Sequence, residues 1–170
     1  APCGWPIDPM RQEIEHMLTA LDGVEQDPRW HPEGDALFHS LQAFEHARRL
    51  TKVPHVWAAA LLHDVGKAID GPSHDRVGGD LLEGLVASRI VWLVRHHLCL
   101  LRAPHKTRRR LRHTPELAEL EVLRRCDLAA RSPSAHVCSL NEALDVVFDT
   151  PGALFLSNVD LDADYLLPEL

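Results

Sequence analysis

The chain has 170 residues, of which 45% are hydrophobic, and this is enough apolar surface to fill the core of one domain. Its formal net charge of −7 and pI of about 5.9 exclude a surface that coats nucleic acid or acidic membrane over its whole extent, although a local basic patch stays compatible with them. No apolar run reaches the roughly 18 residues that a membrane-spanning helix needs, and the first residues lack a basic segment followed by an apolar one. The four cysteines are scattered without a C-x-x-C pair, so we expect reduced thiols in a cytoplasmic protein that does not enter a membrane.

In chain order, apolar residues at helical spacing, capping residues and terminating glycines or prolines predict a succession of helices. The first ends at Asp22 and Gly23, and a connection rich in proline and glycine follows over residues 27–34. Asp35 is then the expected N-cap of the second helix, and Gly66 ends the third. The predicted helices span residues 9–22, 36–50, 54–65, 73–85, 88–98, 114–131 and 140–149.

No stretch has a partner that alternates apolar and polar residues as a strand would, so we predict an all-α, single-domain bundle of about seven helices. Within the domain 1–170, the candidate site residues fall between about 30 and 131. The helices at 9–22 and 140–149 are expected to pack on this core, and residues 151–170 form an acidic tail. Residues 102–112, which carry a run of Lys and Arg, are expected to form an exposed loop or short helix.

Polar residues lie at the ends or inward faces of the predicted apolar helices. His63 and Asp64 emerge at the end of an apolar run that starts at Trp57, and an unpaired buried charge costs several kcal/mol, so a metal ion is the economical partner. Five imidazoles and two carboxylates exceed what one tetrahedral site needs, which predicts two ions bridged by Asp64. The ligand candidates are His39, His63, Asp64, His74, His96, His97 and Asp127.

The types of residue in this set of candidate ligands predict both the metals and the reaction. Ligation that is rich in imidazole and poor in carboxylate favours Mn, Fe, Co, Ni or Zn over Mg or Ca. Two divalent ions with two carboxylates leave a positive site that suits an anionic substrate, and they lower the pKa of a bridging water while binding phosphoryl oxygens. We therefore predict hydrolysis of a phosphoester with Asp64 and Lys67 as catalytic residues. Lys67 would neutralise the phosphate or assist the leaving group, unless it is a solvated lysine after a helix end.

The ordered set of ligand candidates resembles the HD-domain metal-dependent phosphohydrolase superfamily over roughly residues 30–131. Several stretches are especially similar to the HD domain attached to bacterial CCA-adding tRNA nucleotidyltransferases, and the separation of His39 and His63 also fits that subgroup. These stretches are WHPEGD at 30–35, HSL at 39–41, HDVGK at 63–67, HDRVG at 74–78 and LVRHHL at 93–98.

The resemblance implies an HD-type helical bundle around a metal centre. Its first ion would lie among His39, His63, Asp64 and Asp127, and its second would be bound by Asp64 and the three remaining histidines of the set. The resemblance also implies hydrolysis of phosphomonoesters or phosphodiesters, often of nucleotides. The tRNA-associated members suggest 2′,3′-cyclic phosphate or 2′-phosphate substrates, so an RNA 3′ end is a candidate partner. The sequence departs from those enzymes in showing no nucleotidyltransferase domain.

Several residues near this set allow two interpretations each. His46, on the same helix face as His39, is the rival for the first ligand position, and Asp35 either caps its helix or approaches an ion. Arg76 and Arg95 flank ligand candidates and either bind phosphate or form ordinary ion pairs. The basic stretch is either a solvated face or a surface that steers an anionic substrate or RNA end. The predicted substrate-binding residues are Arg76, Arg95, Arg102, Arg108 and Arg109.

Two other functions remain open from the sequence. Inositol-oxygenase-like di-iron proteins share much of the ligand set and also carry a lysine three residues after the aspartate, so an HD-type di-iron oxygenase is the first alternative. The second is a non-catalytic nucleotide-binding sensor, which would bind its ligand without turnover. The adjacent His96 and His97 favour hydrolysis, with a phosphorylated small molecule or nucleotide as the expected partner.

Overall fold

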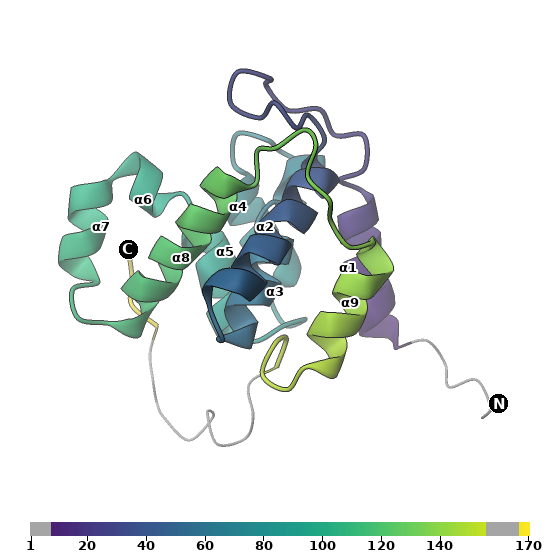
Figure 1. Cartoon of the computed structure of the whole chain (residues 1–170). Coiled ribbons are helices and arrows are strands. Elements are labelled where there is room, and N and C mark those ends of the chain that lie inside the picture. The colour runs from purple at the N-terminus through teal and green to yellow at the C-terminus, as the bar shows by residue number, and fades with distance from the viewer. Residues whose placement is uncertain (1–7, 156–166) are drawn as a thin grey trace.

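The computed structural model describes residues 8–155 and 167–170, so most of the expected acidic tail lies outside the described residues. In this part of the chain the regular structure is helical, apart from one isolated antiparallel bridge between Glu25 and Asp35. The all-α prediction is therefore confirmed. The elements are α1 (Pro9–Thr19), α2 (Ala36–Leu50), α3 (Pro54–Leu62), η1 (Val65–Ala68), α4 (His74–Leu82), α5 (Ser88–His96), α6 (Cys99–Arg102), α7 (Pro104–Arg110), α8 (Pro115–Ala129) and α9 (Leu140–Asp149) (Figure 1).

Each of the seven expected helices is present, and the main differences from the predicted boundaries lie near the site. The helix expected over 54–65 ends at Leu62, and the short 3₁₀ helix η1 follows after His63 and Asp64. Gly66 within η1 packs so closely on the backbone of α4 that no Cβ would fit there. The basic stretch forms two short helices, α6 and α7, because Pro104 cannot continue the first and instead begins the second.

Helix α3 lies at the centre of the bundle and packs against α2, α5, α8 and α9. Residues 58–62, three alanines and two leucines, are all fully buried. Small side chains let the neighbouring helices approach closely, and the removal of apolar area from water contributes roughly 25 cal/mol per Å² to the stability of the packed helix. The helix therefore ends deep inside the molecule, where it places His63 and Asp64 with only 1% of each residue exposed.

The loop between α1 and α2 folds over the N-terminus of α2. The carboxylate of Asp35 caps this helix by accepting a hydrogen bond from the N–H of Phe38 (2.8 Å), and it also accepts one from the N–H of Gly23 (2.6 Å). Gly34 turns the chain just before the cap with a φ of 81°, and its carbonyl accepts a hydrogen bond from the N–H of Gln26. These bonds account for Asp35 as a cap, and they hold the loop where it forms one wall of the site.

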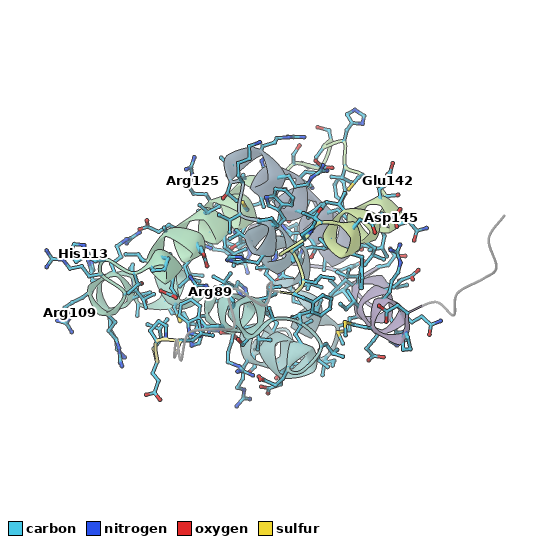
Figure 2. The ribbon with its side chains drawn as sticks, turned by 90° about the horizontal axis from the view of Figure 1, so that it is seen from below. Arg89, Arg109, His113, Arg125, Glu142 and Asp145 are labelled. Carbon is cyan, nitrogen blue, oxygen red and sulfur yellow. The ribbon has the colours of Figure 1, made fainter. Side chains whose placement is uncertain are left out.

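The two ends of the bundle differ in charge. Helices α1 and α9 lie side by side at one end, joined by an ion pair of 2.6 Å between Arg11 and Asp145, whereas α6 and α7 project at the other end (Figure 1). Figure 2 shows Arg109 and His113 at the α7 end and Glu142 with Asp145 at the opposite end. Among the described residues, we find no helix whose length and apolar character would let it cross a bilayer.

Candidate metal centre

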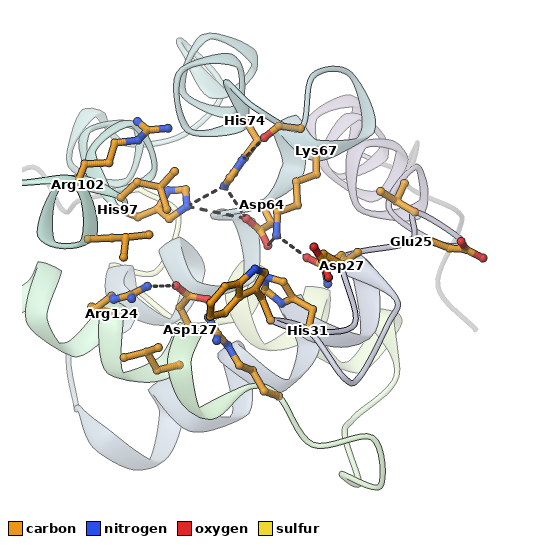
Figure 3. Close-up of a pocket in the computed structure, with 18 residues that line it drawn as sticks. Glu25, Asp27, His31, Asp64, Lys67, His74, His97, Arg102, Arg124 and Asp127 are labelled. Carbon is orange, nitrogen blue, oxygen red and sulfur yellow. Dashed lines mark hydrogen bonds and ion pairs between the residues drawn. The ribbon is translucent and has the colours of Figure 1, made fainter.

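The carboxylate of Asp64 is the centre of the site, because four imidazoles surround it in two groups. Its Oδ2 atom lies 3.4 Å from Nε2 of His63 and 3.6 Å from Nε2 of His39. Its Oδ1 atom lies 3.2 Å from Nε2 of His74 and 3.9 Å from Nε2 of His97 (Figure 3). Within each group, one potential ligand atom from each residue lies within 4.8 Å of the others, which is close enough to share a cation. Two groups that could each hold a metal ion therefore meet at one carboxylate.

The backbone fixes the orientation of these imidazoles. In each ring Nδ1 donates a hydrogen bond to a carbonyl oxygen at 2.6 to 2.8 Å, so Nε2 is the nitrogen that can bind a metal ion when the ring is neutral. Hydrogen bonds of this kind set the tautomer and orientation of histidines that bind metals. The carbonyl partners are Ala130 for His39, Ala60 for His63, Gly71 for His74 and Val94 for His97.

Three buried polar atoms at the centre have no hydrogen-bond partner among the described residues. They are Nε2 of His39, Nε2 of His63 and Oδ2 of Asp64, all within one ligand group. Two of them have a charged neighbour, since Oδ2 of Asp64 lies 2.6 Å from Nζ of Lys67 and Nε2 of His39 lies 3.3 Å from Oδ1 of Asp127. The cost of about 1–3 kcal/mol for an unpartnered buried polar atom therefore applies to Nε2 of His63, and a cation between the three would contact all of them. The residues present thus fit a metal, and nitrogen donors combined with one carboxylate suit a divalent transition metal.

Burial controls the protonation of two of the imidazoles. Desolvation lowers the pKa of His63 and lowers that of His97 to about 3. For His74, burial acts in the same direction, but the hydrogen bond and the charge of Asp64, together with the hydrogen bond to the Gly71 carbonyl, outweigh it and the pKa is raised. Neutral imidazole is the form that binds a metal ion, so His63 and His97 are ready to act as ligands at neutral pH.

His39 differs because it faces a carboxylate at each of its nitrogens. Burial alone would lower its pKa, but Asp127, 3.3 Å from Nε2, and Glu33, 2.7 Å from Nδ1, raise it to about 9. Burial would raise the pKa of Asp127, but the interaction with His39 holds it below the ordinary value. A divalent cation bound at Nε2 would take the place of the proton that His39 otherwise holds there.

Two basic residues hold the carboxylates in place. Nζ of Lys67 lies 2.6 Å from Oδ2 of Asp64 and 2.5 Å from Oε1 of Gln26. Burial would raise the pKa of Asp64, but its cationic surroundings, Lys67 among them, keep it well below the usual range, so Asp64 is ionised. On the other side, Arg124 donates a hydrogen bond of 2.9 Å to Oδ2 of Asp127 (Figure 3).

A cavity of about 870 Å³ opens over this centre, within the size range of small-molecule sites. Asp64, His74 and His97 line it together with Lys67 and Asp127. The lining also includes apolar side chains that are exposed to solvent and are not part of the hydrophobic core. These are Trp30, Leu101 and Leu128, with exposed fractions of 63%, 55% and 47%. The cavity therefore suits a ligand that has both an anionic part and an apolar part.

The structure does not bring every predicted ligand to the centre. Nδ1 of His96 donates a hydrogen bond of 2.8 Å to the carbonyl of Trp92, and its ring lies 4.7 Å from the indole ring of the same residue. His96 belongs to neither ligand group, and neither does His46, the rival of His39. The predicted ligands that do converge are His39, His63, Asp64, His74, His97 and Asp127.

Of the five arginines predicted to bind substrate, Arg102 lines the cavity, where it forms an ion pair of 2.5 Å with Asp75. The other four lie outside the lining among the described residues. Two of them form ion pairs with acidic side chains near the end of α4 and on α8, and the other two are exposed. The paired residues are Arg95 and Arg108, and the exposed ones are Arg76 and Arg109.

Sequence reasoning missed Glu33 and His31. The side chain of Glu33 is fully buried, and its Oε1 accepts a hydrogen bond from Nδ1 of His31 (2.8 Å) and lies 2.7 Å from Nδ1 of His39. Glu33 therefore places a carboxylate next to Nδ1 of His39, on the side of the ring that faces away from Asp64. The available signal was the WHPEGD stretch, where His31 and Glu33 lie on either side of a proline in a turn. Helical periodicity does not extend to such a turn. Trp30, Gln26 and Arg124 were also missed.

Comparisons with known proteins agree with this geometry. A family model described as HD domain matches residues 37–132. The chain is 43% identical over 81 residues to the multifunctional CCA protein of Hahella chejuensis, covering 44% of this chain and 19% of that protein. It is 43% identical over 68 residues to the protein of the same name from Methylococcus capsulatus, covering 36% of this chain and 16% of that protein. The chain thus matches less than a fifth of the length of these relatives, and the resemblance drawn from the sequence is confirmed. Because the family model covers more than half of the 170 residues, the chain belongs to the HD domain family.

Proposed function

We propose that this protein is a metal-dependent phosphohydrolase, acting as a phosphomonoesterase or phosphodiesterase on a nucleotide-type or 2′,3′-cyclic phosphate substrate. The observation that carries the proposal is the sharing of Asp64 between two groups of oriented imidazoles beneath an open cavity. Membership of the HD domain family supports it. Two divalent ions are the simplest occupants, with Mn, Fe, Co, Ni and Zn preferred over Mg. Such ions supply Lewis-acid activation of water and neutralise phosphoryl oxygens.

The residues of the chain have distinct roles in this proposal. Asp64 is ionised and presents one oxygen to each ligand group, and His63 and His97 offer neutral nitrogen donors. Lys67 lines the cavity next to Asp64, so its ammonium group can donate a hydrogen bond to a phosphoryl oxygen or to the leaving oxygen. Such a preorganised donor typically contributes about 10²–10³ in kcat. Arg124 acts through Asp127, which it holds in place.

Hydrolysis of p-nitrophenyl phosphate, bis-p-nitrophenyl phosphate, nucleoside monophosphates and 2′,3′-cyclic nucleotides tests the proposal, with each metal added separately. We expect Asp64→Asn to abolish turnover and Lys67→Met to lower kcat about a hundredfold. Lys52→Met is the matched control, because Lys52 is exposed and does not line the cavity.

Three outcomes would contradict the proposal. No turnover with any metal would overturn it. Oxygen uptake by the iron-loaded protein without phosphate release would replace it with the di-iron oxygenase. Nucleotide binding without turnover would replace it with the sensor.

A further inference from the structure

The positive charge of the chain is concentrated on one projection. Residues 98–115 contain six Lys or Arg and no Asp or Glu, although the whole chain has a net charge of −7. This stretch forms α6, α7 and the turn before α8. Figure 2 shows Arg109 and His113 at this end, pointing away from the bundle. Four of the six cations are exposed and form no ion pair with residues 8–155 or 167–170. They are Lys106, Arg109, Arg110 and Arg112.

The basic projection is continuous with the metal-centre cavity. Arg102 lines that cavity and also lines a second, smaller one of about 210 Å³ against α7. Lys106 and Arg110 line the second cavity as well. Cations therefore run from the metal centre along α6 and onto α7. A single nucleotide at the centre would leave those on α7 unused, whereas a chain of phosphates that leaves the cavity past Arg102 would meet them in turn.

The lining of the cavity also includes exposed apolar side chains. Among the described residues six large hydrophobic side chains are exposed, and three of these six line this one cavity. Trp30 is the most exposed of the three and presents an indole ring, while Leu101 and Leu128 complete the apolar rim. A nucleobase has a flat face that stacks on such a ring, and an aromatic platform next to a basic track is the usual arrangement for binding single strands.

We propose that the protein binds the end of a single-stranded nucleic acid, with the terminal nucleotide in the cavity, its base against Trp30, and the preceding phosphates along Arg102 and α7. A duplex end does not fit as well, because its last base is stacked and paired. An anionic membrane does not fit either, because α7 (PHKTRRR) exposes no large apolar side chain that could enter a bilayer. The fate of the bound end rests on the proposed hydrolysis, whereas the binding itself does not.

Fluorescence anisotropy with labelled ten-nucleotide RNA and DNA of mixed sequence tests the binding on the full chain. We expect the triple variant Lys106→Ala, Arg109→Ala, Arg110→Ala to bind about tenfold or more weakly at 0.1 M salt. The slope of log affinity against log salt should fall by about 2, because about 0.7 counterions are released per phosphate contact on a single strand. These side chains are exposed, so the melting temperature should stay that of the parent chain.

The stacking platform has its own variants. Trp30→Ala should weaken binding of the oligonucleotide roughly tenfold with an unchanged salt slope, and Trp30→Phe should restore most of the affinity. The charge control is the triple variant Arg48→Ala, Arg49→Ala, Lys52→Ala, which removes the same charge from exposed positions at the end of α2 that line neither cavity.

The outcomes separate this inference from the proposed hydrolysis. Tighter binding of RNA, of DNA, or equal binding of both supports the inference and identifies the source of the strand. Equal loss of affinity in the control variant, equal binding of a blunt duplex, or no binding at micromolar protein overturns it. If bis-p-nitrophenyl phosphate is not hydrolysed with any metal but the variants weaken strand binding as expected, the inference stands and the proposed hydrolysis fails.

Discussion

Gly66 packs directly on the backbone of α4, and both the fold and the position of His74 depend on this contact. A Cβ at this position would lie 2.7 Å from the backbone N of Gly78 and 2.9 Å from the carbonyl carbon of His74, and it would be closer still to the His74 oxygen. Ordinary contact begins near 3.4 Å, and all three atoms belong to the backbone, so Gly66→Ala must push η1 and α4 apart. Overpacking of this kind costs typically about 1–3 kcal/mol. For a chain of this length, that corresponds to a drop in melting temperature of roughly 3–10 °C.

The same displacement moves His74 away from Asp64, whose Oδ1 lies 3.2 Å from its Nε2. We therefore expect Gly66→Ala to weaken metal binding about 10–100-fold, the range seen when the support of a metal ligand is disturbed. Thermal melts with and without EDTA, together with metal titrations, measure both effects. Gly71→Ala is the matched control for the melting temperature, since a Cβ at Gly71 meets no atom within 4 Å. Because the Gly71 carbonyl orients His74, metal affinity is compared with that of the parent chain. If Gly66→Ala melts as Gly71→Ala does and binds metal as the parent chain does, the reasoning about this contact is wrong.

Three further predictions follow from the site and its surroundings. Glu33→Gln should lower metal affinity about 10–100-fold with little change in fold, because Glu33 supports Nδ1 of His39; metal titration checks this, and unchanged affinity would refute it. Burial would raise the pKa of Glu119, but His55 and Arg89 lower it below 4.5, so this carboxylate stabilises the fold above about pH 4.5 and loses its contribution as the pH falls through the lowered pKa. Urea unfolding between pH 3 and pH 6 should therefore depend less on pH in Glu119→Gln. Removal of metal should lower the free energy of unfolding, by up to about 4 kcal/mol for an ion present at 1,000 times its Kd, and the melting temperature should fall with it. Identical melts with and without EDTA would contradict a bound metal.

Helical periodicity was sufficient to predict the bundle, because its helices bury an apolar stripe that repeats along the sequence. The seven expected helices are all present, and α3 was recognisable from its apolar run. The site residues that lie on or directly after these helices could be predicted with them. His39, on the inward face of α2, is fully buried, and His63 with Asp64 follows the buried end of α3.

Two features of the site could not be read from periodicity. His96 and His97 are adjacent at the end of α5, and side chains of neighbouring helical residues point about 100° apart, so only one can face the centre. Trp92, one turn before His96, was the available signal, since its carbonyl and ring hold that imidazole away from the centre. Glu33 lies in a turn whose path is set by tertiary contacts, so no local pattern predicts that it is buried.

The burial that stabilises α3 also determines the chemistry of the residues that follow it. An apolar helix that ends inside the molecule desolvates His63, which lowers its pKa and keeps it neutral as a ligand. The same desolvation leaves Nε2 of His63 without a hydrogen-bond partner among the described residues. A buried nitrogen of this kind costs about 1–3 kcal/mol in the absence of a cation. The helix at the centre of the bundle therefore ends in a buried site whose energetic cost a bound cation would relieve, so we expect metal affinity and fold stability to change together in variants of this helix end.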